Sequence, residues 1–238
     1  MSDPAPAGFE STWQRCSGIP GWLKEGQARM LYDEALTLPP GGTVLEIGSH
    51  QGRSTVVLAD AARGRDAHVI AVDPFVEGKL FGGQSTRSRF EHNLAEAGVT
   101  DAVTLLADYS TRARPGWTRP LDLLYIDGKH DYWTFADDLR WKAFLPEGGR
   151  VLVHDAFSSI GVTLGILVHV LFARDLRYVD RSDSMARFEK ARPDLRDRMR
   201  ILGELPWWLR NVGIKVLLRL RLRPVARLFG HDSPYDPY

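Results

Sequence analysis

Short apolar runs alternate with helical patterns along the first 190 residues. Five of the runs are apolar almost without interruption, and we expect them to be strands: residues 43–47, 68–72, 103–106, 121–126 and 150–153. A strand that is apolar on both sides has to be covered on both faces. The pattern therefore predicts a parallel sheet with helices on each side.

Helices are expected between these strands. Their predicted ranges are 27–38, 54–62, 90–97, 133–144 and 160–173, and the first is stopped by Pro39-Pro40-Gly41-Gly42. Two further short runs, 176–179 and 186–188, lie on either side of Asp183-Ser184 and predict a closing hairpin. The alternation predicts a doubly wound α/β fold, in which ligands bind beyond the carboxyl ends of the strands.

The first strand ends in a glycine-bearing turn. Gly48 and Gly52 permit a tight bend and a close approach of the backbone to a ligand. The spacing does not fit the dinucleotide pattern G-x-G-x-x-G, because His50 and Arg53 stand where glycines would be required. Glu46, just before the turn, favours a cationic or amine-bearing ligand over a pyrophosphate.

Acidic residues follow the next strands as well. Asp73, Asp108, Asp127 and Asp155 each come directly after a predicted strand or within two residues of its end. An acid after the second strand typically accepts hydrogen bonds from a ribose diol, although Asp73-Pro74 is also a common way to begin a turn. Each acid alone could be a turn or cap residue. Four of them on one sheet edge indicate a binding site.

These segments, taken in order, resemble a known family. They read VLEIGSxxGxS at 44–54, VDP at 72–74, YIDGxHxY at 125–132 and GGxxLxHD at 148–155, with a closing LRYVDR…MARFE pair. The set is similar to class I S-adenosylmethionine-dependent O-methyltransferases, and most to the metal-dependent bacterial sugar and macrolide type. The resemblance covers residues 20–190 and implies a Rossmann-like seven-stranded sheet with an antiparallel last strand.

The resemblance also implies a place for S-adenosylmethionine. Its methionine end would lie at Glu46 and the Gly48–Gly52 loop, and its ribose at Asp73. Asp108 and Ser110 would flank the adenine, and Trp22 would stand in a loop that covers the cofactor. The cofactor-binding residues expected in this way are Glu46, Gly48, Ser49, Gly52, Ser54, Asp73, Asp108, Ser110, Asp127 and Trp22.

Two carboxylates from adjacent strands suggest a metal. Asp127 and Asp155 could project into one cleft and, with waters and substrate hydroxyls, suit Mg²⁺. The third ligand stays open, because Ala156 stands where the similar catechol-type enzymes have an asparagine; His154, on the other side of Asp155, is the candidate. Either His130 or His154 is the expected catalytic base, since imidazole titrates near neutral pH. The alternatives are that the acids cap the following segments and that the histidines are hydrogen-bonded scaffold.

Composition narrows the class of protein. The chain has 238 residues and a net charge of +1, which excludes a polyelectrolyte built for nucleic acid. Its single cysteine, Cys16, fits a reducing compartment without disulfides. The N-terminus has no apolar segment of the signal-peptide type, and the apolar stretch at 160–173 is shorter than the ~20 residues that a membrane span requires. We therefore expect a cytoplasmic protein.

The charge is distributed unevenly. Residues 191–230 contain ten basic and three acidic residues, which predicts a methyltransferase domain at 1–190 and a basic C-terminal extension at 191–238. A homodimer interface is the favoured role for the extension. An acceptor lid, with Trp207 and Trp208 as aromatic surface, and a membrane-surface element are the alternatives. The glycine-rich segment 77–86 could cover the cleft.

The expected function is Mg²⁺-assisted transfer of a methyl group from S-adenosylmethionine to a hydroxyl of a small polar acceptor. A sugar is the favoured acceptor, and the resemblance points in particular to a methylmannose oligosaccharide precursor of mycobacteria. Two other functions stay open. One is methylation of a lipid or quinone at a membrane surface, and the other is S-adenosylmethionine binding without catalysis.

Overall fold

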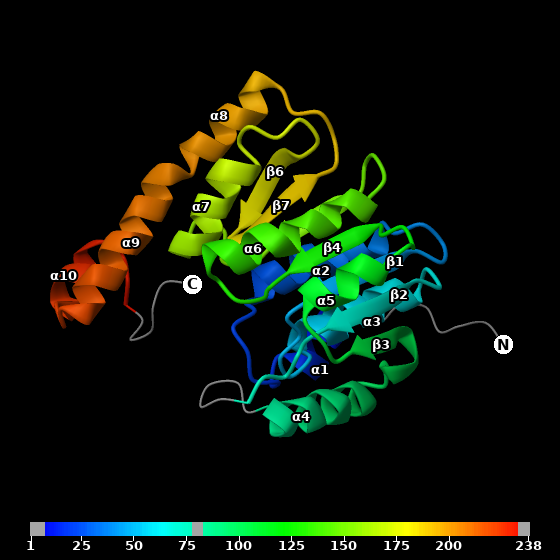
Figure 1. The fold of residues 1–238 in the computed structure, drawn as a ribbon. Coiled ribbons are helices and arrows are strands. Elements are labelled where there is room, and N and C mark those ends of the chain that lie inside the picture. Colours follow the sequence, from blue (N-terminus) through cyan, green and yellow to red (C-terminus); the bar gives the residue numbers. More distant parts are fainter. Residues whose placement is uncertain (1–7, 78–82, 233–238) are drawn as a thin grey trace.

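The computed structural model describes residues 8–77 and 83–232, and its centre is a seven-stranded sheet (Figure 1). The strand order is β3-β2-β1-β4-β5-β7-β6. The strands are β1 (Thr43–Ile47), β2 (His68–Val72), β3 (Val103–Leu106), β4 (Leu123–Ile126), β5 (Arg150–Val153), β6 (Arg177–Ser182) and β7 (Met185–Glu189). Four of these have the predicted bounds, because their apolar runs stop abruptly at polar or glycine-containing turns.

Strand direction sets the position of the site. β1 to β5 are mutually parallel, and β7 is antiparallel to both β5 and β6. The predicted fold class is thereby confirmed. The chain runs outward from β1 to β3 and then returns to β4 on the other side of β1. This reversal is the switch point at which open α/β sheets form their binding crevice.

Helices cover both faces of the sheet. One apolar core joins the sheet to α1 (Phe9–Cys16), α2 (Glu25–Leu36), α3 (Arg53–Arg63) and α4 (Gly83–Glu96). A second core on the opposite face joins it to α6 (Tyr132–Asp138), α7 (Ile160–His169) and α8 (Leu195–Gly203). Figure 1 shows these layers, with the short α5 (Ser110–Ala113) after β3. Residues on both faces of β1 and β4 are buried, as continuous apolar strands require.

Several helices differ from the sequence prediction. The expected helix 133–144 divides into α6 and the 3-10 turns of η3 (Leu139–Phe144), and α7 stops at His169 instead of continuing to 173. The two short 3-10 segments η1 (Thr100–Ala102) and η2 (Arg114–Gly116) flank β3 and α5. α4 begins at Gly83, so it takes in part of the expected glycine-rich cover at 77–86. The remainder of that cover, 78–82, lies outside the described residues.

The basic extension is helical. α8 is followed by α9 (Leu205–Arg219) and α10 (Arg223–Leu228), which reach beyond the sheet (Figure 1). α9 is attached to the domain through the segment after β5: the Asn211 amide donates to the Phe157 carbonyl (3.4 Å), and Lys215 Nζ donates to the Ser158 carbonyl (3.1 Å). Across residues 8–77 and 83–232, no helix is both long and apolar enough to cross a membrane.

Candidate active site

The glycine loop after β1 lies at the switch point. Close packing explains why glycine occupies two of its positions. Gly48 (φ +87°) and Gly52 (φ +89°) both have backbone angles that disfavour other residues. A Cβ on Gly48 would run into the backbone carbonyl of Asp127, and one on Gly52 would lie 2.8 Å from Leu94 Cδ1. The glycines therefore bring the end of β1 against the end of β4 and let α3 start close to α4.

Glu46 lies behind this loop, away from solvent. Its side chain is fully buried and accepts hydrogen bonds from the hydroxyls of Ser49 (2.9 Å), Ser54 (2.5 Å) and Thr55 (2.5 Å). Burial raises the pKa of Glu46 to about 7, although the three hydroxyls lower it in part. The sequence predicts that Glu46, Ser49 and Ser54 bind the cofactor, and this stays a prediction. In the structure their side chains fix the loop onto α3.

Asp73 organises the loop from the neighbouring strand. One carboxylate oxygen accepts from the backbone N–H groups of Ser49 (3.0 Å) and His50 (2.9 Å), and the other accepts from Phe75 N–H (2.8 Å). A carboxylate offers about four lone-pair sites, so one direction is left for a ligand hydroxyl. The predicted ribose-binding residue thus lies against the glycine loop, where a diol acceptor is needed.

The other expected cofactor residues lie around this loop. Trp22 is 60 % exposed, and its ring centre is 5.4 Å from that of His50 in the loop. Ser110 donates to Asp138, a buried acid of α6 whose pKa burial raises to about 6. Asp108 accepts from Tyr109 N–H (2.7 Å) and pairs with Arg112 (3.5 Å), so both of these contacts are to residues close by in the sequence.

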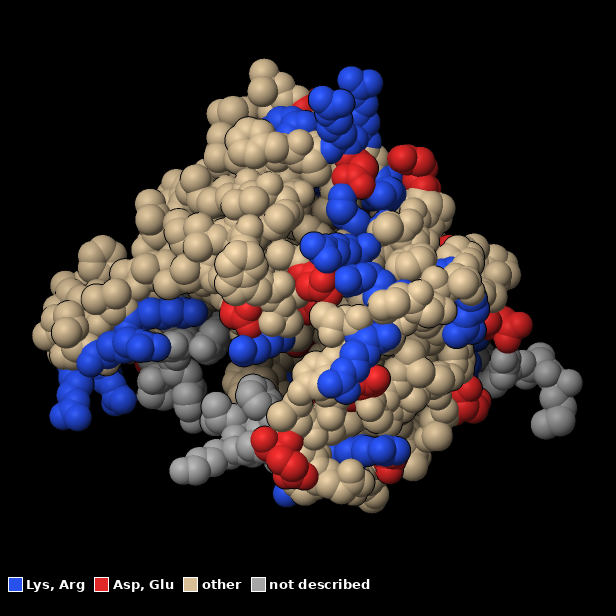
Figure 2. Space-filling model, viewed as in Figure 1, with Lys and Arg blue, Asp and Glu red and all other residues tan. Residues whose placement is uncertain are grey.

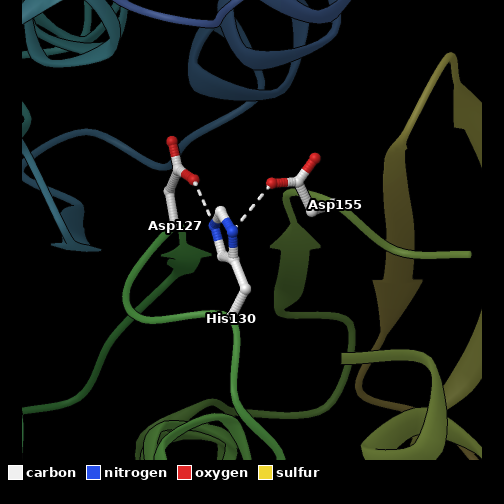
Figure 3. A group of neighbouring side chains, drawn as sticks. All are labelled: Asp127, His130 and Asp155. Atoms are coloured by element: carbon white, nitrogen blue, oxygen red, sulfur yellow. Dashed lines mark ion pairs between the residues drawn. The ribbon is translucent and has the colours of Figure 1, made fainter. Parts of the chain in front are cut away.

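The ends of β4 and β5 carry a compact cluster of Asp127, His130 and Asp155 (Figure 3). The imidazole of His130 stands between the two carboxylates, with Nδ1 3.1 Å from Asp155 and Nε2 3.6 Å from Asp127. Asp155 has a left-handed backbone (φ +55°), which is costly for a residue with a side chain and is common at functional sites. The His130 side chain is 39 % exposed, so a substrate can reach it.

His154 lies beneath the cluster and is almost completely buried. Its Nδ1 is 3.4 Å from an oxygen of Asp127 and 3.4 Å from one of Asp155, and its Nε2 is 3.3 Å from Gln27 Oε1. Gln27 donates to Ser184 (3.1 Å), and Ser184 donates to Asp155 (3.4 Å). Both ring nitrogens therefore lie near oxygen atoms, which favours the charged form of the ring. The sequence named His154 as one of two candidate bases and as a metal ligand; the structure buries it and leaves His130 partly exposed.

The charges of the cluster reinforce one another. Burial alone would lower the pKa of His154, but Asp127 and Asp155 outweigh it and raise that pKa to about 9. Burial would raise the pKa of Asp155, but the two histidines bring it down to about 2. Burial would lower the pKa of His130 as well. The interactions with Asp127 and Asp155 outweigh burial and raise the pKa of His130 above its ordinary value. The two carboxylates therefore favour the charged form of both rings.

Gln27 and Ser184 are the residues that sequence reasoning missed. Gln27 lies in α2 and Ser184 in the turn between β6 and β7, and both are fully buried. The only signal for Ser184 was its place in the Asp183-Ser184 hairpin turn. A single glutamine in a helix gave no signal, because its partners lie 127 and 157 residues away.

The donor set of the cluster can be compared with the needs of a divalent cation. Carboxylate oxygens from two adjacent strand ends fit Mg²⁺, which prefers hard oxygen ligands and keeps several waters. An imidazole nitrogen is a better ligand for transition metals than for Mg²⁺. The residues that fit Mg²⁺ are therefore Asp127 and Asp155.

Residues 45–156, a little under half of the chain, match the model of a family described as a methyltransferase domain. The matched residues run from β1 to just beyond β5, the part of the sheet that carries the glycine loop and the cluster.

Three solved structures illustrate the shared fold. The chain is similar to the methyltransferase PaMTH1 of Podospora anserina bound to S-adenosylhomocysteine (TM-score 0.61, 14 % identity, 78 % of this chain and 88 % of that one). It is also similar to the O-methyltransferase TomG of Streptomyces achromogenes, involved in tomaymycin synthesis and bound to S-adenosylmethionine (TM-score 0.52, 20 % identity, 79 % of this chain and 88 % of that one). An rRNA methylase of Streptococcus thermophilus is similar too (TM-score 0.52, 16 % identity, 72 % of this chain and 100 % of that one).

Proposed function

We propose that this protein transfers a methyl group from S-adenosylmethionine to a hydroxyl of a small polar acceptor. In this proposal His130 is the base, and Asp127 and Asp155 hold Mg²⁺. The observation that carries it is the cluster at the ends of β4 and β5, in which a half-exposed imidazole stands between two carboxylates beside the glycine loop. Fold alone does not select hydroxyl over nitrogen or carbon as the acceptor atom.

The chain's own residues supply binding and orientation. S-adenosylmethionine supplies a methyl group on a sulfonium, which is already a good electrophile. Asp73 offers its remaining lone-pair direction to a ribose hydroxyl and holds the backbone of the loop at Ser49 and His50. Carboxylates at several strand ends favour a ligand with a cationic sulfonium and ammonium. The fixed loop then brings the methyl group in line with the acceptor, which is the geometric part of catalysis.

Proton removal is the second task, and His130 is placed for it. It reaches solvent, and Asp155 orients the ring from 3.1 Å at Nδ1. Nε2 lies 3.6 Å from Asp127, beyond hydrogen-bond distance, so this nitrogen can accept a proton. The same carboxylates stabilise the imidazolium that forms when His130 takes the hydroxyl proton. A bound Mg²⁺ would ease loss of that proton by withdrawing charge from the hydroxyl. The charge that the carboxylates favour on His154 in turn lowers the pKa of Asp155.

A sugar is the acceptor class that we favour. The support is the resemblance to bacterial sugar and macrolide methyltransferases in the GGxxLxHD and YIDGxHxY segments. A methylmannose oligosaccharide is the first acceptor that we would test. A homodimer also stays a proposal, since nothing in the single chain bears on it.

The first experiment is calorimetric titration of S-adenosylmethionine, with magnesium and then with a chelator. We expect micromolar binding by the wild type. Asp73→Asn should weaken it at least about tenfold, because its amide NH₂ would face the N–H groups of Ser49 and His50. Asp101→Asn, an exposed acid paired with Arg63, is the matched control and should leave the affinity unchanged. Absence of binding by the wild type would overturn the proposal.

The second experiment measures methyl transfer from labelled S-adenosylmethionine to a panel of hydroxylated sugars. His130→Gln should lower kcat by about 10²–10⁴-fold, the usual contribution of a general base, while cofactor affinity is retained. The exposed His92→Gln is its control. Full activity in the His130 variant would exclude it as the base. Activity that is unaffected by chelator would exclude the assigned role of Mg²⁺.

A further inference from the structure

The end of the C-terminal extension has an unusual composition. From residue 205 to residue 231 the sequence contains six basic residues and no acidic one. Between the basic residues lie leucines, valines and a phenylalanine. The segment forms α9, α10 and the turns beside them, so both kinds of side chain belong to one helical hairpin.

The apolar side chains of this hairpin are exposed. Leu220 is 63 % exposed, Leu228 84 % and Phe229 56 %. Among the described residues, eighteen large apolar side chains are exposed, and fourteen of them belong to 160–232. Some of these exposed apolar side chains lie outside the hairpin. Four of them follow one another at four-residue spacing on α7 and just beyond it: Ile160, Leu164, Val168 and Phe172. An apolar surface of this extent marks an interaction site.

The basic side chains at the end of the hairpin are unpaired. Arg219, Arg221, Arg223 and Arg227 are exposed, and within the described part of the chain none of them forms a hydrogen bond or an ion pair. Arg210, by contrast, donates to the carbonyl groups of Phe229 and Gly230 and thereby closes the hairpin. Figure 2 shows Lys and Arg side chains gathered below α9 and α10, next to a broad area without charged side chains. We call Arg219, Arg221, Arg223, Arg227, Leu220, Leu222, Leu228 and Phe229 the hairpin tip.

We propose that the hairpin tip docks on the surface of an anionic lipid bilayer. Such a surface offers negative head groups for the arginines and an acyl boundary for the leucines and the phenylalanine, as it does for basic amphipathic helices. A second copy fits less well, because a two-fold contact through this segment would bring two sets of arginines together with no acidic residue of 205–231 to neutralise them. Nucleic acid would match the charge but would leave the leucines without a partner.

Docking would bring the candidate active site close to the bilayer. α9 is bonded to the carbonyl groups of Phe157 and Ser158, which lie two and three residues after Asp155 of the cluster. The hairpin tip is therefore attached to the segment that follows the cluster in the chain. If the proposed function holds, on which this last step rests, the acceptor is the hydroxylated head group of a membrane-associated molecule.

Vesicle sedimentation of the full chain tests the docking directly. The probes are phosphatidylcholine vesicles with and without phosphatidylglycerol, at low and at raised salt. We expect sedimentation only with the anionic vesicles, and less of it at raised salt because screening weakens the attraction. The triple variant Arg219→Gln, Arg221→Gln, Arg223→Gln should weaken partitioning on the order of 100-fold.

Two further variants show whether the loss of vesicle binding comes from the hairpin tip itself and not from the change in net charge or from misfolding. The triple variant Arg174→Gln, Arg192→Gln, Arg196→Gln makes the same charge change at exposed arginines away from the tip and should sediment like the wild type. Leu228→Ser with Phe229→Ser keeps all charges and should also lose binding.

Three outcomes would overturn the docking proposal. They are equal binding to neutral vesicles, no binding to either kind, and a dimer in sedimentation velocity that only the tip variants abolish. Calorimetry with S-adenosylmethionine on the same preparations shows separately whether the proposed function fails.

Discussion

At the scale of single residues, His154 is the most tightly constrained group of the site. It is buried, its Nδ1 faces two carboxylates and its Nε2 faces an amide oxygen. A ring in this position cannot accept a proton from a substrate, so its effect on the reaction is exerted through the two acids. Its charge also links the stability of the fold to pH.

We predict that the free energy of unfolding decreases as pH rises from 7 to 9. The folded-state pKa of His154 is raised to about 9 from an ordinary value of about 6.5. Its stabilising contribution is therefore complete below pH 6.5 and is lost as pH rises through 9. The expected loss is on the order of 1–3 kcal/mol, measured by urea unfolding at each pH in the presence of a chelator.

A variant isolates the histidine responsible. His154→Gln should be less stable than the wild type at pH 7, because Asp155 stays buried without its partner. Between pH 7 and 9 its stability should fall less than that of the wild type. His92→Gln, whose ring is mostly in solvent, should keep the wild-type slope. An equal slope in the His154 variant would contradict the assignment.

At the scale of elements, the contact between the ends of β1 and β4 depends on Gly48. We predict that Gly48→Ala costs more than ~3 kcal/mol, because a Cβ there adds a collision with the Asp127 carbonyl to an unfavourable backbone angle. Gly98→Ala is the matched control: its φ is also positive (+68°), but nothing lies within 4 Å of the added Cβ. It should cost about 1 kcal/mol by urea unfolding. Equal costs would show that backbone angle alone matters.

The elements that were predicted well are the ones whose signal is local. β1, β2, β3 and β5 have the predicted bounds, since each is a short apolar run with polar neighbours. α1 was not predicted, because FESTWQRC has few apolar positions and buries only Phe9, Thr12 and Cys16. The site follows the same rule. Asp127 and Asp155 could be placed from topology, whereas the burial of Glu46 and the contacts of Gln27 depend on tertiary packing.

At the scale of the whole molecule, burial is very uneven. α3 buries nine of its eleven residues, whereas α9 buries two of fifteen, Asn211 and Ile214. We predict that amides of β1, β4 and α3 exchange hydrogen only when the whole domain unfolds, and that those of α10 and the end of α9 exchange at least about 100-fold faster. Hydrogen exchange with mass spectrometry measures both. Equal protection of α9 and α3 would argue for a second contact that covers the hairpin.

The buried contacts that link His154, Gln27, Ser184 and Asp155 have a consequence for how the protein is made. Gln27 leaves the ribosome early, Asp155 much later and Ser184 later still, yet the three meet in one buried chain of contacts with His154. Until Ser184 emerges, Asp155 lacks the hydroxyl that donates to it and β5 has no β7 beside it. A nascent chain cut short before this hairpin turn therefore carries almost every residue of the site and still has no finished site.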